Sequence, residues 1–418
     1  MKRTCLTVSL CVIAAVFSGA ASAQDDQFAL KPQPEIHPWK DDAALHSVEV
    51  LGTKVAWAVG DHGTVWRTSD GGESWSLLQV PADVSLRSAC FLSKRVGDGH
   101  VGTSQIAWLA GRGTRPYTRS GYGVILKTAD GGKSWVTPGE GQILPPLNYV
   151  RFFGPNDGVA VGEATPDFPT GVLTTQDGGE TWQPAPGQQT AGWHAASFAE
   201  LHDGIVTGPR GRISLVAGTN VAPPRLDAGS LRGIRAVSSA DGLTAWAVGD
   251  GATVLSSSNG GVSWEALNAS FPPELSRFVD FAAVSAVNDK VWVTGNPGGC
   301  VWHSPDAGAS WTRQATGHSA PIHSLNFTNE EVGFAVGAFG TILRTTDGGS
   351  SWHVCRAGRR RTAILNIHTR PERIPFGMLA KQGGDEGFRT VAIVVPRRDT
   401  TAETDLSLER QMHDAVTT

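Results

Sequence analysis

Short apolar segments that end in glycine recur along the chain, each set between polar and glycine-rich stretches. A second apolar run precedes each segment, as in LHSVEVL (45–51), LNYVRFF (147–153) and IHSLNFT (322–328). Short apolar runs bounded by turn residues are typical of buried β-strands. The seven segments are WAVG (57–60), WLAG (108–111), VAVG (159–162), IVTG (205–208), WAVG (246–249), WVTG (292–295) and FAVG (334–337).

An octapeptide with the pattern Ser/Thr, any residue, Asp/Asn, a small residue, Gly, two residues and Trp occurs six times, first at 68–75 and last at 345–352. The Asp or Asn side chain can bond amides of its own turn, and the Gly can adopt a positive φ. The hydroxyl can bond a further amide, and the Trp buries a large surface against the hairpin. We therefore expect the octapeptides to close β-hairpins. The residues expected to do so are Asp70, Trp75, Asp130, Trp135, Asp177, Trp182, Asn259, Trp264, Asp306, Trp311, Asp347 and Trp352.

The period of these patterns predicts the architecture. The apolar segments begin 41–51 residues apart, and each unit has room for four short strands. This is the spacing of propeller blades. Only the fourth unit lacks the octapeptide, and it has GRISLVAGTN (211–220) instead. The sequence predicts an all-β protein, a seven-bladed β-propeller over 45–355; the alternative, an array of β-sandwiches, gives no reason for so regular a period.

The first 23 residues read as a secretory signal. Lys2 and Arg3 precede an apolar run from Leu6 to Phe17, and small residues follow up to Ala23. This order is typical of a signal peptide with a cleavage site. The alternative is a retained anchor, but the run is short for a bilayer. We expect an exported protein, periplasmic or extracellular, with a 24–44 extension and no membrane span in the mature chain.

The last part of the chain changes character. RAGRRR (356–361) predicts a basic linker, with an anionic partner as the alternative reading. Within 362–418 the pattern is strand, helix, strand, helix, which is the opening of a parallel α/β sheet. Two strands cannot bury their faces, so we expect either an incomplete second domain or a tail that packs on the propeller.

Composition excludes several classes of protein. Charged residues make up 18% of the chain, and 35 Lys and Arg against 39 Asp and Glu give a net charge of −4. A dedicated nucleic-acid binder is therefore not expected. Cys90, Cys300 and Cys355 show neither metal-ligand nor disulfide-framework spacing, although one Cys300–Cys355 bridge is an alternative. No metal or cofactor is expected.

The octapeptide resembles the Asp-box, or BNR repeat, of sialidases, sortilin-type receptors and xyloglucanases. The succession of AVG-x-x-G and T-x-DGG-x-x-W motifs resembles the photosystem II assembly/stability factor family over about 310 residues. That resemblance implies an exported seven-bladed propeller that binds another protein. The tail is faintly similar to the start of PIG-L-type deacetylases, but His368 is followed by Thr-Arg-Pro-Glu, and the metal motif His-Pro-Asp-Asp of those enzymes is absent.

Two long loops are the candidate binding surface. In propellers the turns between second and third strands line one face, and in relatives of this type the Asp-box hairpins lie on the other. The loops at 111–123 and 162–171 are long and charged, and long loops on a rigid scaffold commonly carry binding. A solvated mixed-charge rim is the alternative. The candidate residues are Arg112, Arg115, Tyr117, Arg119, Glu163, Asp167, Arg210 and Arg212, with Asp61 and Asp250 on the same face.

These residues favour a non-catalytic scaffold or assembly factor that binds a protein, such as a component of a membrane or envelope complex. The alternative is a carbohydrate-binding or sialidase-like propeller, with Tyr117 or Tyr122 as nucleophile beside an arginine cluster. However, both tyrosines share one loop with three of the arginines, and the sialidase motif Arg-Ile-Pro occurs only at 373–375, after the propeller. No catalytic residue is predicted.

Overall fold

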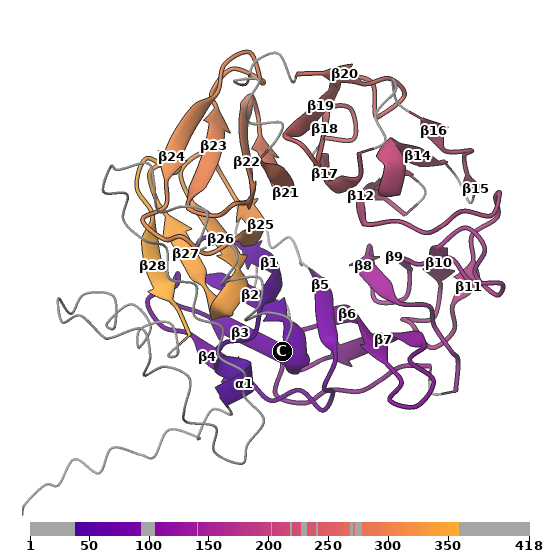
Figure 1. Cartoon of the computed structure of the whole chain (residues 1–418). Helices are drawn as coiled ribbons and strands as arrows, with labels where there is room; N and C mark the ends of the chain where they lie inside the picture. The colour runs from indigo at the N-terminus through magenta and orange to yellow at the C-terminus, as the bar shows by residue number, and fades with distance from the viewer. Residues whose placement is uncertain are drawn as a thin grey trace, which may run out of the picture. The chain divides into compact units, whose positions relative to one another are not determined.

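The computed structural model describes residues 38–92, 105–139, 141–201, 203–217, 220–226, 232–239, 241–267, 271 and 278–358. Seven antiparallel sheets follow one another within this part of the chain, arranged around a central channel (Figure 1). This confirms the predicted all-β, seven-bladed propeller. The predicted signal peptide (1–23), the 362–418 segment and the second half of the basic linker (359–361) lie outside the described residues.

Each blade begins with its innermost strand and proceeds outward. Blade 1 comprises β1 (Leu45–Leu51), β2 (Val55–Gly60), β3 (Thr64–Thr68) and β4 (Ser76–Leu78). Blade 2 comprises β5 (Ser85–Phe91), β6 (Ala107–Thr114) and β7 (Gly121–Thr128). Blade 3 comprises β8 (Leu147–Phe152), β9 (Gly158–Gly162), β10 (Val172–Thr175) and β11 (Gln183–Pro184). Blade 4 comprises β12 (Ala195–Glu200), β13 (Asp203–Thr207), β14 (Arg212–Ala217), β15 (Asn220–Val221) and β16 (Arg225–Leu226).

The remaining three blades have four strands each. Blade 5 comprises β17 (Ile234–Ser239), β18 (Ala245–Gly249), β19 (Thr253–Ser257) and β20 (Glu265–Ala266). Blade 6 comprises β21 (Asp280–Val287), β22 (Lys290–Asn296), β23 (Cys300–Ser304) and β24 (Thr312–Ala315). Blade 7 comprises β25 (Ile322–Phe327), β26 (Gly333–Gly337), β27 (Ile342–Thr345) and β28 (His353–Arg356). Two blades depart from four strands: in blade 2 the fourth is reduced to a bridge between Lys127 and Val136, and in blade 4 both β15 and β16 pair with β14.

The glycine-terminated segments are the second strands of the blades. Every residue of β2, β9, β18 and β26 is buried, because these strands have a bonded strand on each side and another blade against each face. The terminal glycine is needed for a close approach: a Cβ on Gly60 would lie 2.1 Å from the carbonyl oxygen of Ala44. The same clash would arise between Gly337 and Pro321, at 2.0 Å. In six of the seven blades the glycine thus lets the chain that enters the blade cross over the second strand, whereas Gly208 of blade 4 has its nearest neighbour at 3.1 Å.

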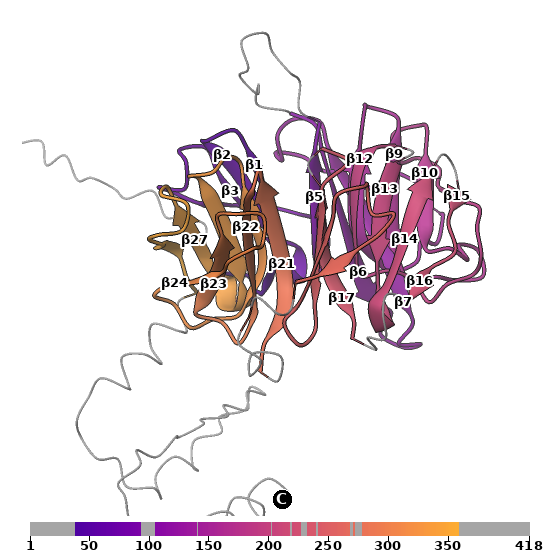
Figure 2. The ribbon, with the colours of Figure 1, turned by 90° about the horizontal axis from the view of Figure 1, so that it is seen from above.

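The two faces of the propeller carry different connections (Figure 2). The turns between second and third strands bond the segments that enter the blades, as Asp61 N does with Ala44 O at 2.9 Å. We call this the entry face. The octapeptides bond the hairpins between first and second strands, as Gly178 N does with Asn156 O at 2.8 Å. They therefore lie on the opposite face.

The octapeptide turns share one hydrogen-bond pattern. In the last of them, buried Thr345 donates to Asp347 Oδ1 at 2.8 Å and accepts from Gly349 N at 2.8 Å. Asp347 accepts further bonds from the amide and the hydroxyl of Ser351 at 2.8 and 2.6 Å. Gly349 has a φ of 89°, which a residue with a side chain rarely adopts. The side chain that the turn buries is the threonine, while the aspartate is exposed.

Blade 5 shows that an amide can replace the carboxylate. Asn259 Oδ1 accepts from Ser257 Oγ and Ser263 N, both at 2.9 Å, and Asn259 Nδ2 donates to Ser263 Oγ at 2.8 Å. The Ser263 hydroxyl therefore accepts a hydrogen bond from Asn259, whereas the equivalent hydroxyl in the other octapeptides donates one to the aspartate.

We predict that Asp347→Asn changes the free energy of unfolding by less than about 0.5 kcal/mol, because the rotated hydroxyl of Ser351 restores the network. Thr345→Val should cost about 1–3 kcal/mol, since it leaves the buried amide of Gly349 without an acceptor. Urea denaturation of both variants measures the difference. Equal costs would show that the carboxylate contributes more than its geometry indicates.

Among the described residues, blades 1 and 7 share no strand, and a side-chain contact joins the two ends of the propeller. Arg356, the last residue of β28, donates to Gly340 O at 2.8 Å and to Asp41 O at 2.9 Å, and it pairs with the Asp41 carboxylate. Its guanidinium carbon lies 3.7 Å from the centre of the Trp66 ring. Asp41 ends α1 (Pro38–Asp41), and both side chains of the pair are nearly buried, at 10% and 12% exposure. We call this contact the clasp.

Two expectations from the sequence concern the cysteines and membrane-spanning segments. Cys90, Cys300 and Cys355 are free thiols, so the alternative Cys300–Cys355 disulfide is not formed. In the part of the chain that the structure describes, no helix is long and apolar enough to cross a membrane.

Candidate functional site

The predicted loop residues lie on the entry face, but few of them meet. Arg112 lies near the end of β6, and its Nη1 lies 3.2 Å from Glu163 Oε1 in blade 3. Within the described ranges, this is the one ion pair among the eight candidates. Tyr117 is fully exposed at the tip of the β6–β7 hairpin, between Arg115 and Arg119. Asp167 follows β9 in the next long loop.

The blade-4 candidates differ from each other. Arg210 lies in the turn between β13 and β14 with a φ of 60°. Arg212 begins β14, donates to Pro209 O and Gly192 O, and lies 5.5 Å from the Trp193 ring. Arg212 therefore links β14 to the turn before it and to the segment that enters blade 4. Of the two candidate nucleophiles, Tyr122 packs against the core between blades 1 and 2, and neither it nor Tyr117 lines the central cavity.

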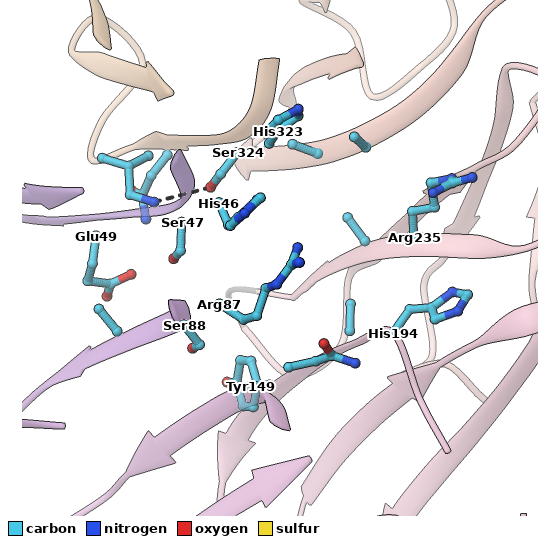
Figure 3. Close-up of a pocket in the computed structure, with 18 of the residues that line it drawn as sticks. His46, Ser47, Glu49, Arg87, Ser88, Tyr149, His194, Arg235, His323 and Ser324 are labelled. Carbon is cyan, nitrogen blue, oxygen red and sulfur yellow. Dashed lines mark hydrogen bonds between the residues drawn. The ribbon is translucent and has the colours of Figure 1, made fainter. Parts of the chain in front are cut away.

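A cavity of about 610 Å³ occupies the central channel (Figure 3). One residue from each blade lines it at the same place, immediately after the buried apolar residue that begins the innermost run of the blade. We call this set the channel ring. Its members are His46, Arg87, Asn148, His194, Arg235, Ala282 and His323.

A β-bulge positions six of the seven ring residues. In blade 1, Leu45 pairs with Gly60 and Ser47 with Val59, so His46 has no partner on β2. The same shift leaves Arg87, Asn148, Arg235, Ala282 and His323 unpaired in their blades. An extra residue in one strand leaves the ladder and re-aims its side chain. In five of these six blades it places a polar side chain at the channel, and in blade 6 it places Ala282 there.

Three ring residues bond the next blade in the same way. Asn148 Nδ2 donates to Trp193 O at 2.8 Å, while His194 Nδ1 lies 3.2 Å from Ile234 O and His323 Nδ1 lies 3.1 Å from Leu45 O. Each acceptor is the residue that precedes the neighbouring ring position. The side chains are therefore held against the channel wall by backbone carbonyls.

Carboxylates of the entry face bond two more ring members. Asp61 Oδ1 lies 2.9 Å from His46 Nε2 and accepts from Ser85 Oγ at 2.5 Å. Burial acts to raise the pKa of Asp61, but the bonds from His46 and Ser85 outweigh it and lower the pKa to about 2. In blade 5, Asp250 pairs with Arg235.

Arg87 is the ring cation without such a partner. Its Nε is buried and has no hydrogen-bond partner in the described part of the chain. Burial and the nearby Arg112 lower its pKa, while Asp61 acts in the opposite direction. A guanidinium that is partly desolvated and unpaired favours an anion in the adjacent space.

A carboxyl group lies deeper in the channel. Glu49 follows His46 by three residues in β1, a distance of about 10 Å along a strand, and it lines the same cavity. At the equivalent place Cys90, Ser197 and Ser285 each accept an amide of the next blade, at 3.1–3.2 Å. Burial raises the pKa of Glu49 to about 7, although Arg151 opposes the shift.

We predict that Glu49→Gln stabilises the protein at high pH. The pKa of Glu49 is higher in the folded chain than its ordinary value of 4.5, so stability falls as pH rises from about 4.5 to about 7. At pH 8 the variant should be more stable than the parent by roughly 3 kcal/mol, and near pH 4.5 this advantage should vanish. Urea denaturation at the two pH values measures it; an advantage that is equal at both would contradict the raised pKa.

The sequence contained a signal for the ring that we did not use. When the innermost strands are aligned, HSVE (46–49), RSAC (87–90), NYVR (148–151), HAAS (194–197), RAVS (235–238), AAVS (282–285) and HSLN (323–326) fall in one column. The first position is His, Arg or Asn in six of the seven. Comparing blades position by position would have found these residues. Of the eight candidates chosen from loop length, only Arg112 lines the cavity, where it also donates to the ring residue Asn148.

Comparisons with known proteins agree with the predicted resemblance. Residues 234–322 match the family model described as "Photosynthesis system II assembly factor YCF48". The chain is 24% identical to "Photosystem II assembly protein Ycf48" of Synechococcus sp. (strain JA-2-3B'a(2-13)) over 341 residues, which cover 77% of this chain and 93% of that protein. The resemblance to the photosystem II assembly factor family is thereby confirmed.

Two further likenesses concern fold and the alternative function. The solved structure "YCF48 bound to D1 peptide" has a TM-score of 0.56 at 18% identity, over 73% of this chain and 94% of that one. At this identity the likeness shows the fold alone. A "Sialidase" of Bacteroides fragilis (strain YCH46) is 27% identical over 153 residues, which is 28% of this chain and 27% of that protein.

Proposed function

We propose that the protein is an exported, non-catalytic scaffold that binds a carboxylate-bearing segment of another protein at the channel ring. The observation that carries the proposal is the convergence of the basic ring residues of five blades on one cavity, with Arg87 unpaired by any described residue. A chain with a net charge of −4 otherwise has little reason to gather these groups. The cavity of about 610 Å³ suits the end or a few side chains of a segment, not a folded domain.

The comparisons support a protein as the partner. The relatives are described as assembly proteins, and one solved relative is described as bound to a peptide. We extend this to the present chain as an assembly role outside the cytoplasm, with a membrane or envelope complex as the source of the segment. The exposed hairpin with Arg115, Tyr117 and Arg119 would contact the partner outside the cavity.

Binding of a synthetic tetraglutamate peptide to the mature chain tests the proposal. Arg87→Ala should weaken binding about tenfold or more, because a cation facing the ligand is lost. Raising the salt concentration from about 0.05 M to about 0.5 M should weaken wild-type binding as well. The control is Arg313→Ala, which removes an exposed arginine of β24 away from the channel. Titration calorimetry measures both variants, and equal affinities in two folded variants would refute the site.

Carbohydrate recognition is the second candidate, because a sialidase matches part of the chain and the ring places Arg87 and Arg235 on separate blades. Fluorogenic sialosides test it. We expect no turnover, since neither predicted tyrosine nucleophile lines the cavity. Hydrolysis that Arg87→Ala abolishes would put the glycosidase first.

A further inference from the structure

Two histidines of the channel ring have a defined tautomer. His194 Nδ1 faces Ile234 O and His323 Nδ1 faces Leu45 O, at 3.2 and 3.1 Å. A carbonyl oxygen only accepts, so Nδ1 carries the hydrogen and donates it. In the neutral ring the lone pair is therefore on Nε2, on the side away from the wall carbonyl. A further proton binds there, next to the cavity that both residues line (Figure 3).

The surroundings of His194 keep it neutral in the empty channel. Burial lowers its pKa, and the cations Arg235 and Arg112 act in the same direction. The bond with Ile234 O and the carboxylate of Asp250 act in the opposite direction, but the net shift is downward.

His323 lies in a similar environment between blades 7 and 1. Burial lowers its pKa, with His46 and Arg87 acting in the same direction and the bond with Leu45 O and Asp61 opposing them. The rings of His323 and His46 are stacked with centroids 5.4 Å apart, so a charge on one opposes a charge on the other.

We propose that anion binding at the channel ring is coupled to protonation of His194 and His323, so that the site binds acidic segments more tightly as pH falls. The proposal rests on the proposed function, because it concerns how the same ring is regulated. A bound anion offsets the cations that disfavour a charged imidazole, and each protonated imidazole adds an N–H donor and a charge facing the ligand. Binding and proton uptake therefore strengthen each other.

Blade 3 supplies the matched control. Asn148 occupies the same ring position and makes the same bond to the next blade through Nδ2, at 2.8 Å from Trp193 O. Replacing His194 and His323 by asparagine should preserve these wall contacts and remove only the titration. Glu49 and His46 also line the cavity and stay in the variant, so the comparison isolates the two substituted histidines.

The test measures binding of the tetraglutamate peptide by calorimetry between about pH 5.5 and about pH 8, where the peptide remains ionised. Wild-type affinity should rise about tenfold or more from the highest to the lowest pH, with proton uptake visible as a heat that depends on the buffer. His194→Asn/His323→Asn should lose the part of this rise that the histidines supply, keep the part that comes from protonation of Glu49, and bind like the wild type at pH 8.

Each outcome separates the two proposals. Parallel pH profiles and equal proton uptake in the two proteins would overturn the coupling, while binding that still depends on Arg87 would leave the proposed function standing. Absence of Arg87-dependent binding at every pH would refute the proposed function itself, and the coupling with it.

Discussion

Replacing Trp108 by alanine should lower the free energy of unfolding by about 3–5 kcal/mol. Trp108, on β6 of blade 2, is fully buried and stacks on Phe152 of blade 3 with ring centroids 3.8 Å apart. Its Nε1 donates to Gly178 O, in the octapeptide of blade 3, at 3.1 Å. The substitution would open a large cavity between two blades and leave a carbonyl of the next turn without its donor.

A pair of phenylalanine variants separates packing from hydrogen bonding. Trp246 occupies the equivalent place in blade 5, but its Nε1 has no partner among the described residues. Trp108→Phe should therefore cost about 1–3 kcal/mol more than Trp246→Phe, which is the penalty for an unsatisfied buried carbonyl. Chemical denaturation measures both. Equal costs would mean that the bond between Trp108 and Gly178 contributes nothing to the junction.

Breaking the clasp should have a similarly large effect. Arg356→Ala removes a nearly buried cation from the Asp41 carboxylate and from the carbonyls of Gly340 and Asp41, and its loss uncovers the Trp66 ring. We expect the free energy of unfolding to fall by about 3–5 kcal/mol, because the nearly buried Asp41 carboxylate loses the cation that faces it.

A double-mutant cycle with Asp41→Ala is the control. If the cost arises from the stranded carboxylate, the double variant should be less destabilised than the sum of the two single variants. Amide exchange at β1 and β28 should quicken first in Arg356→Ala, since the clasp joins these two ends of the ring. Additive costs would show that Arg356 and Asp41 act independently.

The fold was predictable because each blade repeats local patterns. The glycine-terminated segments and the octapeptides each reflect a local structural requirement. At Gly60 the backbone of another segment passes too close for a side chain, and at Gly349 the turn amide needs an acceptor. Such requirements appear directly in the sequence. The clasp does not, because Asp41 and Arg356 are 315 residues apart and no local pattern joins them.

The binding site was predictable only in part, and the reason is the bulge. Loop length directed attention to the hairpin tip, where Tyr117 is exposed, and to Arg212, which instead packs on Trp193. A one-residue register shift changes where a side chain points without changing the apolar character of its strand. Arg87 and His323 face the cavity from such bulges, and loop length carries no signal for either residue.

The bulge also affects how this protein can diversify. A residue outside the ladder can be exchanged without breaking a strand-to-strand bond, so the six bulged ring positions can vary while the strands that frame them stay the same. Ala282 is the ring position that carries no polar group, and it lies at the same register shift as Arg87. Natural variation or laboratory selection can thus change the charge and shape of the channel mouth one blade at a time. The glycine-terminated segments and the octapeptides, which determine the fold, need not change.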